Sequence, residues 1–206
     1  MARPLVRVFL VFPALLAACG GGGGSNAITL AIPSAAATDG FVTSTQFVDT
    51  GTPISAGDTD GSFQNVARGF VRFDLSGIPA AVTILSAELR LHQSAVIGAP
   101  YTTLGGVVVD HVDIGAALDS TDFGAVALQS GLGVLSNDSG IGLKTLNVTA
   151  QVRADLAAAR SNADFRLRFP TGSDADGFDD YVQFNDGEDS FGNGVKPLLV
   201  VRYEAP

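Results

Sequence analysis

Acidic residues gather in two turn-like segments, and their spacing indicates a site for a hard cation. The segments are Asp58-Thr59-Asp60-Gly61 and the stretch from Asp174 to Asp180. Ca2+ prefers about six to eight oxygen ligands, which such loops supply, although an EF-hand would need Gly at its sixth position and Glu at its twelfth. Asp and Gly also favour ordinary turns, and that alternative stays open. The expected ligands of a structural Ca2+ are Asp58, Asp60, Asp174, Asp176 and Asp179.

Four arginines fall on predicted strands at positions that face away from the core: Arg72, Arg90, Arg166 and Arg168. On neighbouring strands they would form a basic patch that attracts acidic polymers such as polyuronates. The alternative, which we favour, is a cross-strand ladder in which they pair with Asp74 and Glu88. Each exposed pair of this kind contributes less than about 1 kcal/mol. The net charge of -9 also opposes the binding of a polyanion.

Aromatic side chains outside the predicted strands are few. The chain has no Trp, three Tyr and 13 Phe, and most of the Phe fall on strand positions that point inward. A flat ring can bury the CH face of a sugar while its rim stays wet. Tyr101, in the loop from Gly98 to Gly106, is therefore the first candidate for ligand contact, followed by Phe178 and Phe191. An ordinary surface position is the alternative for all three.

Residues for catalysis form no recognisable pattern. His92 and His111 do not stand beside a nucleophile, and Gly-x-Ser-x-Gly is absent. Strand alternation places Asp110 on the opposite face from His111 and Asp113, which disfavours a metal site there. We therefore expect a protein that is not an enzyme, with a glycosidase carboxylate pair among the 21 acidic residues as the alternative.

The first 18 residues have the organisation of an export signal. Arg3 and Arg7 precede an uncharged apolar run from Val8 to Ala18, which is shorter than the roughly 20 residues that span a bilayer. The run ends in Leu16-Ala17-Ala18-Cys19, which resembles the lipobox of bacterial lipoproteins. By this resemblance residues 1–18 are a lipoprotein signal peptide and Cys19 is the lipidated first residue of the mature chain. Chance similarity before ordinary cleavage, or a buried free Cys, is the alternative.

Residues 19–27 are expected to join the lipid anchor to the folded part. Gly20 to Gly24 form a flexible tether, and Gly20, in place of Asp, resembles the sorting pattern of outer-membrane lipoproteins facing the periplasm or the cell surface. Each buried CH2 of an acyl chain contributes about 0.8 kcal/mol to membrane anchoring. Removal of residues 1–18 leaves 10 basic and 21 acidic residues, a net charge of -11. Without a basic stripe, the chain is not expected to bind nucleic acid.

The remainder of the chain alternates apolar and polar residues with the period of a β-strand. The clearest examples are the stretches from Val71 to Leu75 and from Leu85 to Leu91, separated by a Ser-Gly-Ile-Pro turn. Many short strands with turns between them favour a sandwich or barrel. The other expected strands are Ile28–Ile32, Gln46–Val48, Gly106–Ile114, Lys144–Val148, Phe165–Phe169, Asp180–Phe184 and Pro197–Tyr203.

One segment departs from the strand pattern. The stretch from Ala150 to Arg160 is rich in helix formers, and Val148, Val152 and Leu156 are spaced by four residues. We expect one short helix here, at an end of the sandwich. The single Cys forbids an intrachain disulfide, so a hydrophobic core or bound ions must stabilise the domain.

The stretch from Arg68 to His92 reads RGFVRFDLSGIPAAVTILSAELRLH. It resembles the signature of the DNRLRE domain, a family of secreted bacterial proteins related to family 96 carbohydrate-binding modules. The matching parts are an Arg ahead of a Phe-Val-Arg-Phe-Asp-Leu strand, a Ser-x-Ile-Pro turn and a Ser-Ala-x-Leu-Arg-Leu strand. Later pieces agree in order at Leu146–Thr149, Phe165–Phe169 and Pro197–Tyr203, so that the resemblance covers most of residues 38–203.

This resemblance implies a jelly-roll-like fold and, for some relatives, binding of polysaccharides such as alginate. Relatives often carry a mid-domain Trp that this chain lacks. We therefore expect residues 28–206 to form an all-β domain, a jelly-roll-like antiparallel β-sandwich with one short helix. The expected function is non-catalytic polysaccharide binding at the cell envelope, through the loops at 55–66, 98–106 and 172–180. The alternative, which the low aromatic content favours, is a structural or protein-adhesion module of the envelope or matrix.

Overall fold

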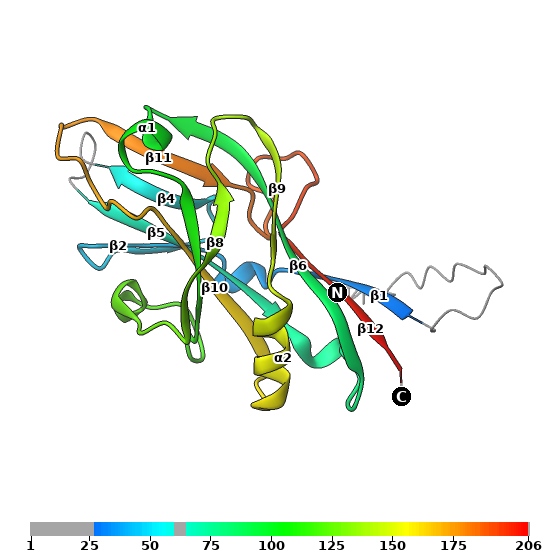
Figure 1. The fold of residues 1–206 in the computed structure, drawn as a ribbon. Coiled ribbons are helices and arrows are strands. Elements are labelled where there is room, and N and C mark those ends of the chain that lie inside the picture. Colours follow the sequence, from blue (N-terminus) through cyan, green and yellow to red (C-terminus); the bar gives the residue numbers. More distant parts are fainter. Residues whose placement is uncertain (1–26, 60–64, 206) are drawn as a thin grey trace, which may run out of the picture.

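Most of the expected strands form, but of Gln46–Val48 only Val48 belongs to a strand, and the strands at Gly40–Thr43, Ile54–Thr59 and Gln129–Ser136 were not expected. The computed structural model describes residues 27–59 and 65–205, and all its strand pairs are antiparallel (Figure 1). The predicted signal peptide, Cys19 and Asp60 lie outside the described residues. The strands are β1 (Ala27–Pro33), β2 (Gly40–Thr43), β3 (Val48–Thr50), β4 (Ile54–Thr59), β5 (Val66–Asp74), β6 (Thr83–Ile97), β7 (Val107–Val112), β8 (Gln129–Ser136), β9 (Gly142–Asn147), β10 (Asn162–Arg168), β11 (Asp179–Phe184) and β12 (Leu198–Glu204).

Helices are few and short in the described chain. Helix α2 (Thr149–Ala157) is the one that the sequence predicts, and α1 (Pro100–Thr103) is a single additional turn inside a segment expected to be a loop. Single turns of 3-10 helix lie at η1 (Ala36–Thr38), η2 (Leu75–Gly77) and η3 (Ser120–Gly124). The expected all-β antiparallel sandwich with a short helix is confirmed. Within the described residues, no helix is both long and apolar enough to cross a membrane.

Hydrogen bonds connect the strands in the order β1-β12-β6-β11-β4-β5-β10-β7-β8, with β2, β3 and β9 attached at its sides. This path bends back on itself, and the inward side chains of its two halves form one apolar core. Phe73, Leu89, Phe165 and Phe184 are among the fully buried members of this core. Helix α2 lies at one end of the sandwich (Figure 1), where Val152 joins the same core.

Strand β5 has hydrogen-bonded neighbours on both edges along its length. Ala67 lies opposite Thr43 of β2 and opposite Gly57 of β4, whereas Phe70 lies opposite Gly40 of β2 and Arg166 of β10. Since a strand has only two edges, β4 and β10 occupy the same edge at different heights and must diverge. At one end of β5, the β2–β3 hairpin and the pair β4–β11 therefore belong to the same sheet.

The segment between β7 and β8 covers the outer face of β5 and β10. Its residues Ile114 and Leu118 pack with Val42, Phe70 and Val112 in a second apolar cluster. The alternation from Val71 to Leu75 correctly predicts the inward face of β5. The expectation that the other face is open to solvent is wrong, because residues 113–128 lie over it.

A β-bulge changes the alternation in β6. The pairing between β6 and β12 shifts between Arg202 and Tyr203, so that Tyr203 lies opposite Ile84. Ile84 is consequently buried and Leu85 only partly buried, although the sequence pattern places Leu85 inward. From Ala87 onward the predicted alternation is correct.

A buried carboxylate joins three distant segments at one end of the sandwich. Asp39 is fully buried and accepts hydrogen bonds from the Ser34 hydroxyl, from the Arg72 N–H at 3.4 Å and from the Gly187 N–H at 3.1 Å. Burial raises the pKa of Asp39 to about 7, against the lowering effect of these hydrogen bonds. The folded protein therefore binds a proton here that the unfolded chain releases.

We expect the stability that depends on protonated Asp39 to be complete below about pH 4 and lost as the pH rises through about 7. The free energy of unfolding of the wild type, relative to Asp39→Asn, should fall by up to about 4 kcal/mol over this window, at about 1.4 kcal/mol per pKa unit. Urea denaturation of both proteins at four pH values measures this difference. A difference that stays constant with pH would contradict the assignment.

Candidate functional site

A cleft of about 570 Å3 lies along the sheet made by β3, β2, β5, β4 and β11, on the face of β5 opposite to the one that residues 113–128 cover. Cavities of about 300–1,000 Å3 are the usual size for small-ligand sites. Side chains from all five strands and from the adjoining turns line it: Phe41, Thr43, Thr45, Phe47, Asp49, Thr52, Pro53, Ser55, Thr59, Asn65, Ala67, Tyr181 and Gln183.

The strand register explains why these side chains share one face. Thr43, Ala67, Gly57 and Tyr181 lie directly opposite one another on consecutive strands, and directly opposite residues point to the same side of a sheet. The Thr43 N–H donates to the Phe47 carbonyl oxygen at 2.9 Å, which places Phe47 at the outer end of this row. A single row of residues thus crosses the cleft from one aromatic ring to another.

Small residues occupy the middle of the row. Gly57 has a φ of +132°, and a Cβ there would lie 2.4 Å from the backbone oxygen of Asp180, so that only glycine fits. Ala67, its neighbour on β5, is almost fully buried. The two form a low floor, whereas Phe47 and Tyr181 rise at its ends.

Aromatic rings form much of the apolar surface of the cleft. Phe47 is 55% exposed, although a large apolar side chain is usually buried. Its ring centroid lies 6.1 Å from that of Phe41, with an angle of 48° between the planes. Burial and the charge of Asp179 raise the pKa of Tyr181, so its hydroxyl is protonated at neutral pH. The cleft therefore offers ring surfaces together with a hydroxyl group.

Two polar atoms of the cleft lack hydrogen-bond partners within the described part of the chain. They are Oδ1 of Asn65, a residue that is 9% exposed, and Oγ1 of Thr52. A buried acceptor without a partner costs about 1–3 kcal/mol, so such an atom often marks a position that a ligand or water fills. Both residues line the cleft, which makes it the best candidate for a binding site.

Of the segments expected to hold a ligand, 55–66 contributes Ser55, Thr59 and Asn65 to the cleft, but the rest of the cleft was not expected. Phe41, Phe47 and Tyr181 are separated by up to 140 residues and come together only because β2, β4 and β11 are neighbours of one sheet. The sequence nevertheless contains a local signal for part of the cleft. On either side of a turn, lining residues recur at every second position, at Phe41 and Thr43 and again at Phe47 and Asp49. Such a pattern predicts a hairpin with two rings on one face.

Tyr101, the first aromatic candidate from the sequence, lies on α1 and contributes to the fold. Its hydroxyl donates to Gln93 Oε1 at 2.5 Å and lies 3.0 Å from the Ser136 hydroxyl. Its ring packs against Phe169 with a centroid distance of 5.7 Å. Burial raises the pKa of Tyr101 to about 12. These internal contacts, rather than a surface position, occupy the side chain.

The expected arginine patch is divided between buried and exposed positions. Arg72 and Arg166 are each 6% exposed, so the expectation that they face solvent is wrong. Each pairs with the residue directly opposite on the next strand: Arg72 with Asp164 at 2.7 Å and Arg166 with Asp110 at 2.8 Å. A cross-strand ladder therefore exists for Arg72 and Arg166, but with Asp164 and Asp110 as its acids. Of the two expected acids, Glu88 pairs with Arg90 on the same strand.

Asp110 is the centre of this ladder. Its buried carboxylate also accepts from Arg168 at 2.8 Å and from the Gly131 N–H at 2.8 Å. Burial alone would raise the pKa of Asp110, but the hydrogen bonds from Arg168, Gly131 and Arg166 together hold it well below its ordinary value. Arg90 differs from the other three, since its pair with Glu88 at 2.6 Å is about 40% exposed on both sides.

The buried arginines also hold the covering segment in place. Arg72 donates to the Gly115 carbonyl oxygen at 2.7 Å, and Arg166 donates to that of Ala125 at 2.8 Å. The guanidinium of Arg68 lies 4.1 Å above the ring of Phe123 and donates to its carbonyl oxygen. These side chains thus connect residues 113–128 to β5 and β10 and are directed away from the cleft.

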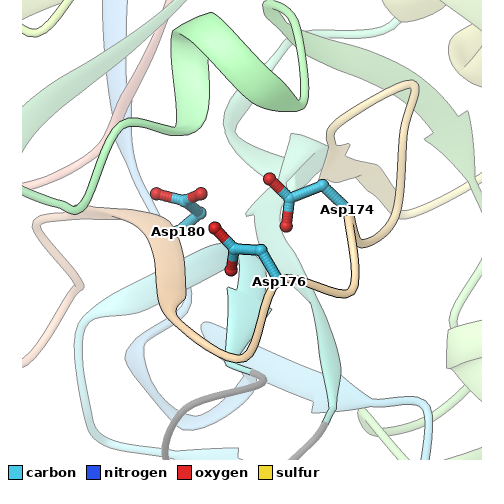
Figure 2. Close-up of side chains that lie close together, drawn as sticks. All are labelled: Asp174, Asp176 and Asp180. Atoms are coloured by element: carbon cyan, nitrogen blue, oxygen red, sulfur yellow. The ribbon is translucent and has the colours of Figure 1, made fainter.

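Three acidic side chains meet near the start of β11. Asp174, Asp176 and Asp180 point toward one another (Figure 2), and one carboxylate oxygen from each lies within 4.8 Å of the others. Asp180 is already engaged by the Ala99 N–H and by the Thr103 hydroxyl at 3.1 Å. The group has the oxygen chemistry that Ca2+ prefers.

The predicted calcium ligands are only partly brought together. Asp174 and Asp176 belong to the cluster, but the third member is Asp180 and not Asp179, because neighbouring strand residues point to opposite faces. In the sequence, Asp180 alternates with the apolar residues Val182 and Phe184, which indicates that it points to the opposite face of β11 from Asp179. Asp58 is buried on β4 and accepts the Asp174 N–H at 3.2 Å.

The two histidines lie apart from the cleft. His111 Nε2 lies 2.9 Å from the carboxylate of Asp155, and this buried contact joins β7 to α2. His92 Nδ1 lies 3.4 Å from the Ser94 hydroxyl on the same strand. A comparison of the chain with protein-family models found no match, and a search of curated proteins found no similar sequence.

Asp110→Asn should destabilise the protein by about 3–5 kcal/mol, because it leaves the buried guanidinium of Arg166 and the partly buried one of Arg168 without their counter-charge. The matched change Glu88→Gln removes an exposed partner and should cost less than about 1 kcal/mol. Urea denaturation at pH 7 compares the two variants. Equal losses of stability in the two variants would show that burial of the Asp110 ion pairs adds nothing to their effect on stability.

Calcium binding at Asp174, Asp176 and Asp180 stays a prediction. Because a ligand that binds only the folded state raises stability, millimolar Ca2+ should raise the Tm of the wild type but not that of Asp176→Asn. Glu188→Gln, which removes an exposed carboxylate outside the cluster, is the control and should respond like the wild type. An identical Tm of the wild type in Ca2+ and in chelator would contradict the prediction.

Proposed function

We propose that this chain is a non-catalytic carbohydrate-binding module of a bacterial envelope lipoprotein, and that it binds polysaccharide in the cleft. The observation that carries the proposal is the row of residues in which Phe47 and Tyr181 stand on either side of a low floor. A pyranose ring presents CH groups on its faces and hydroxyls around its rim. It can pack its faces on the rings while its rim stays hydrogen-bonded.

The polar groups of the cleft suit such a ligand. Asn65 Oδ1 and Thr52 Oγ1 gain the hydrogen bonds that they lack when sugar hydroxyls approach. Among the described residues, the exposed ring of Phe47 has one aromatic contact, which is with Phe41. Burial of such a ring by a ligand contributes favourable free energy in proportion to the apolar area covered.

The resemblance of residues 68–92 to the DNRLRE signature supports the same class of ligand. Export, lipidation at Cys19 and an outer-membrane location belong to the proposal as well, on the basis of the lipobox-like Leu16-Ala17-Ala18-Cys19. On this account a Gly-rich tether holds the domain near the membrane and leaves the cleft free to meet extended polymers.

An adhesion module is the second candidate, favoured by a different surface. Val134 of β8, Ile141 just before β9 and Leu143 of β9 are each more than half exposed, and exposed apolar groups that lie together often mark protein interfaces. Among the described residues, β8 is also the last strand of the sheet path, which is where a partner strand would add.

Binding of the purified protein to soluble polysaccharides, measured by isothermal titration, tests the proposal. Phe47→Ala should weaken binding by about tenfold or more, which corresponds to about 1.4 kcal/mol, and the exposed side chain can be removed with little effect on folding. Leu143→Ala, on β9 away from the cleft (Figure 1), should bind like the wild type. The absence of saturable binding across the panel would refute the carbohydrate proposal and favour adhesion.

A further inference from the structure

We infer that the cleft selects neutral saccharides and rejects polyuronates, with Asp49 as the residue that determines this specificity. The inference rests on the proposed function and specifies its ligand class. It follows from the charge of the cleft, from the positions of the arginines and from the balance of hydrogen-bond acceptors and donors.

The cleft carries a negative charge and no positive one. Asp49 is the single charged residue among the lining side chains of the described chain, which include no Lys, Arg or His. It lies directly opposite Phe41 on the neighbouring strand, so its carboxylate stands on the ring-bearing face. A uronate carboxylate placed there would meet a like charge with no cation to neutralise it.

The arginines that would attract a polyuronate point elsewhere. Arg72 and Arg166 are buried with Asp164 and Asp110, and Arg168 shares Asp110. Arg68 lies against Phe123 on the opposite face of β5. None of these side chains lines the cleft, so their charges are committed to holding residues 113–128.

Two polar groups of the cleft can only accept hydrogen bonds, and they stand among side-chain hydroxyls that both donate and accept. Asn65 Oδ1 accepts and cannot donate, and the Asp49 carboxylate is also acceptor-only. Among the described residues, Asp49 takes part in no side-chain hydrogen bond or ion pair. The matching ligand must therefore supply donors, as hydroxyl groups do and carboxylates do not.

Hydrogen bonds from neutral hydroxyls to an ionised carboxylate are about twice as strong as bonds between neutral groups. Asp49 thus stabilises a bound neutral sugar and repels an acidic one with the same atoms. Because the residue is only partly buried, on the short strand β3, its replacement should leave the fold intact.

The test compares laminarin, galactomannan and maltoheptaose with alginate and polygalacturonate, at low and high salt, on the wild type, Asp49→Asn and Phe47→Ala. The wild type should bind at least one neutral saccharide and neither polyuronate. Asp49→Asn should weaken neutral binding by about tenfold. Glu188→Gln, which removes an exposed acid elsewhere, should change neither.

The outcomes separate this inference from the proposed function. If the wild type binds a polyuronate as tightly as any neutral saccharide and Phe47→Ala abolishes this binding, the cleft is a carbohydrate site but the inference is wrong. If Asp49→Asn leaves neutral binding unchanged, Asp49 does not determine specificity and the inference is again wrong. If no saccharide binds, or if Phe47→Ala binds like the wild type, the proposed function itself fails.

Discussion

The two hydrogen-bonding edges of β5 determine how the layers of this protein are joined. A strand offers two hydrogen-bonding edges, and β5 uses one for β2 and divides the other between β4 and β10. The division forces the layers apart at one end and encloses the core between them. The same divergence curves the sheet around the cleft, where Phe47 and Tyr181 lie at the two ends of the row that includes Ala67 and Gly57.

Buried charge gives the two faces of this region different roles. On one face, Arg72 and Arg166 pair with Asp164 and Asp110 and hold residues 113–128 over the sheet. Removing one member of such a pair leaves an uncompensated charge, so this face is committed to structure. The other face keeps exposed ring surface and unpartnered acceptors, which are the features of a binding site rather than of a core.

Local alternation predicted much of the fold but little of the cleft. The strands around Val71 and Leu89 were predictable because their burial follows a period of two, whereas β4 and β8 contain Gly and polar residues that hide the pattern. The burial of Arg72 could not be foreseen, because the segment that covers it begins about 40 residues later in the chain. Likewise, no local pattern places Asn65 beside Phe41, since their proximity results from the pairing of β2 and β4 with β5.

We propose that a saccharide occupies the cleft above Ala67 and Gly57. Titration of the isotopically labelled protein with neutral oligosaccharides, followed by amide chemical shifts, shows where a sugar binds. We predict saturable shifts concentrated at Phe47, Asn65, Ala67 and Tyr181, with little change in β8 and β9. Shifts confined to β8 and β9, or an unchanged spectrum, would contradict it.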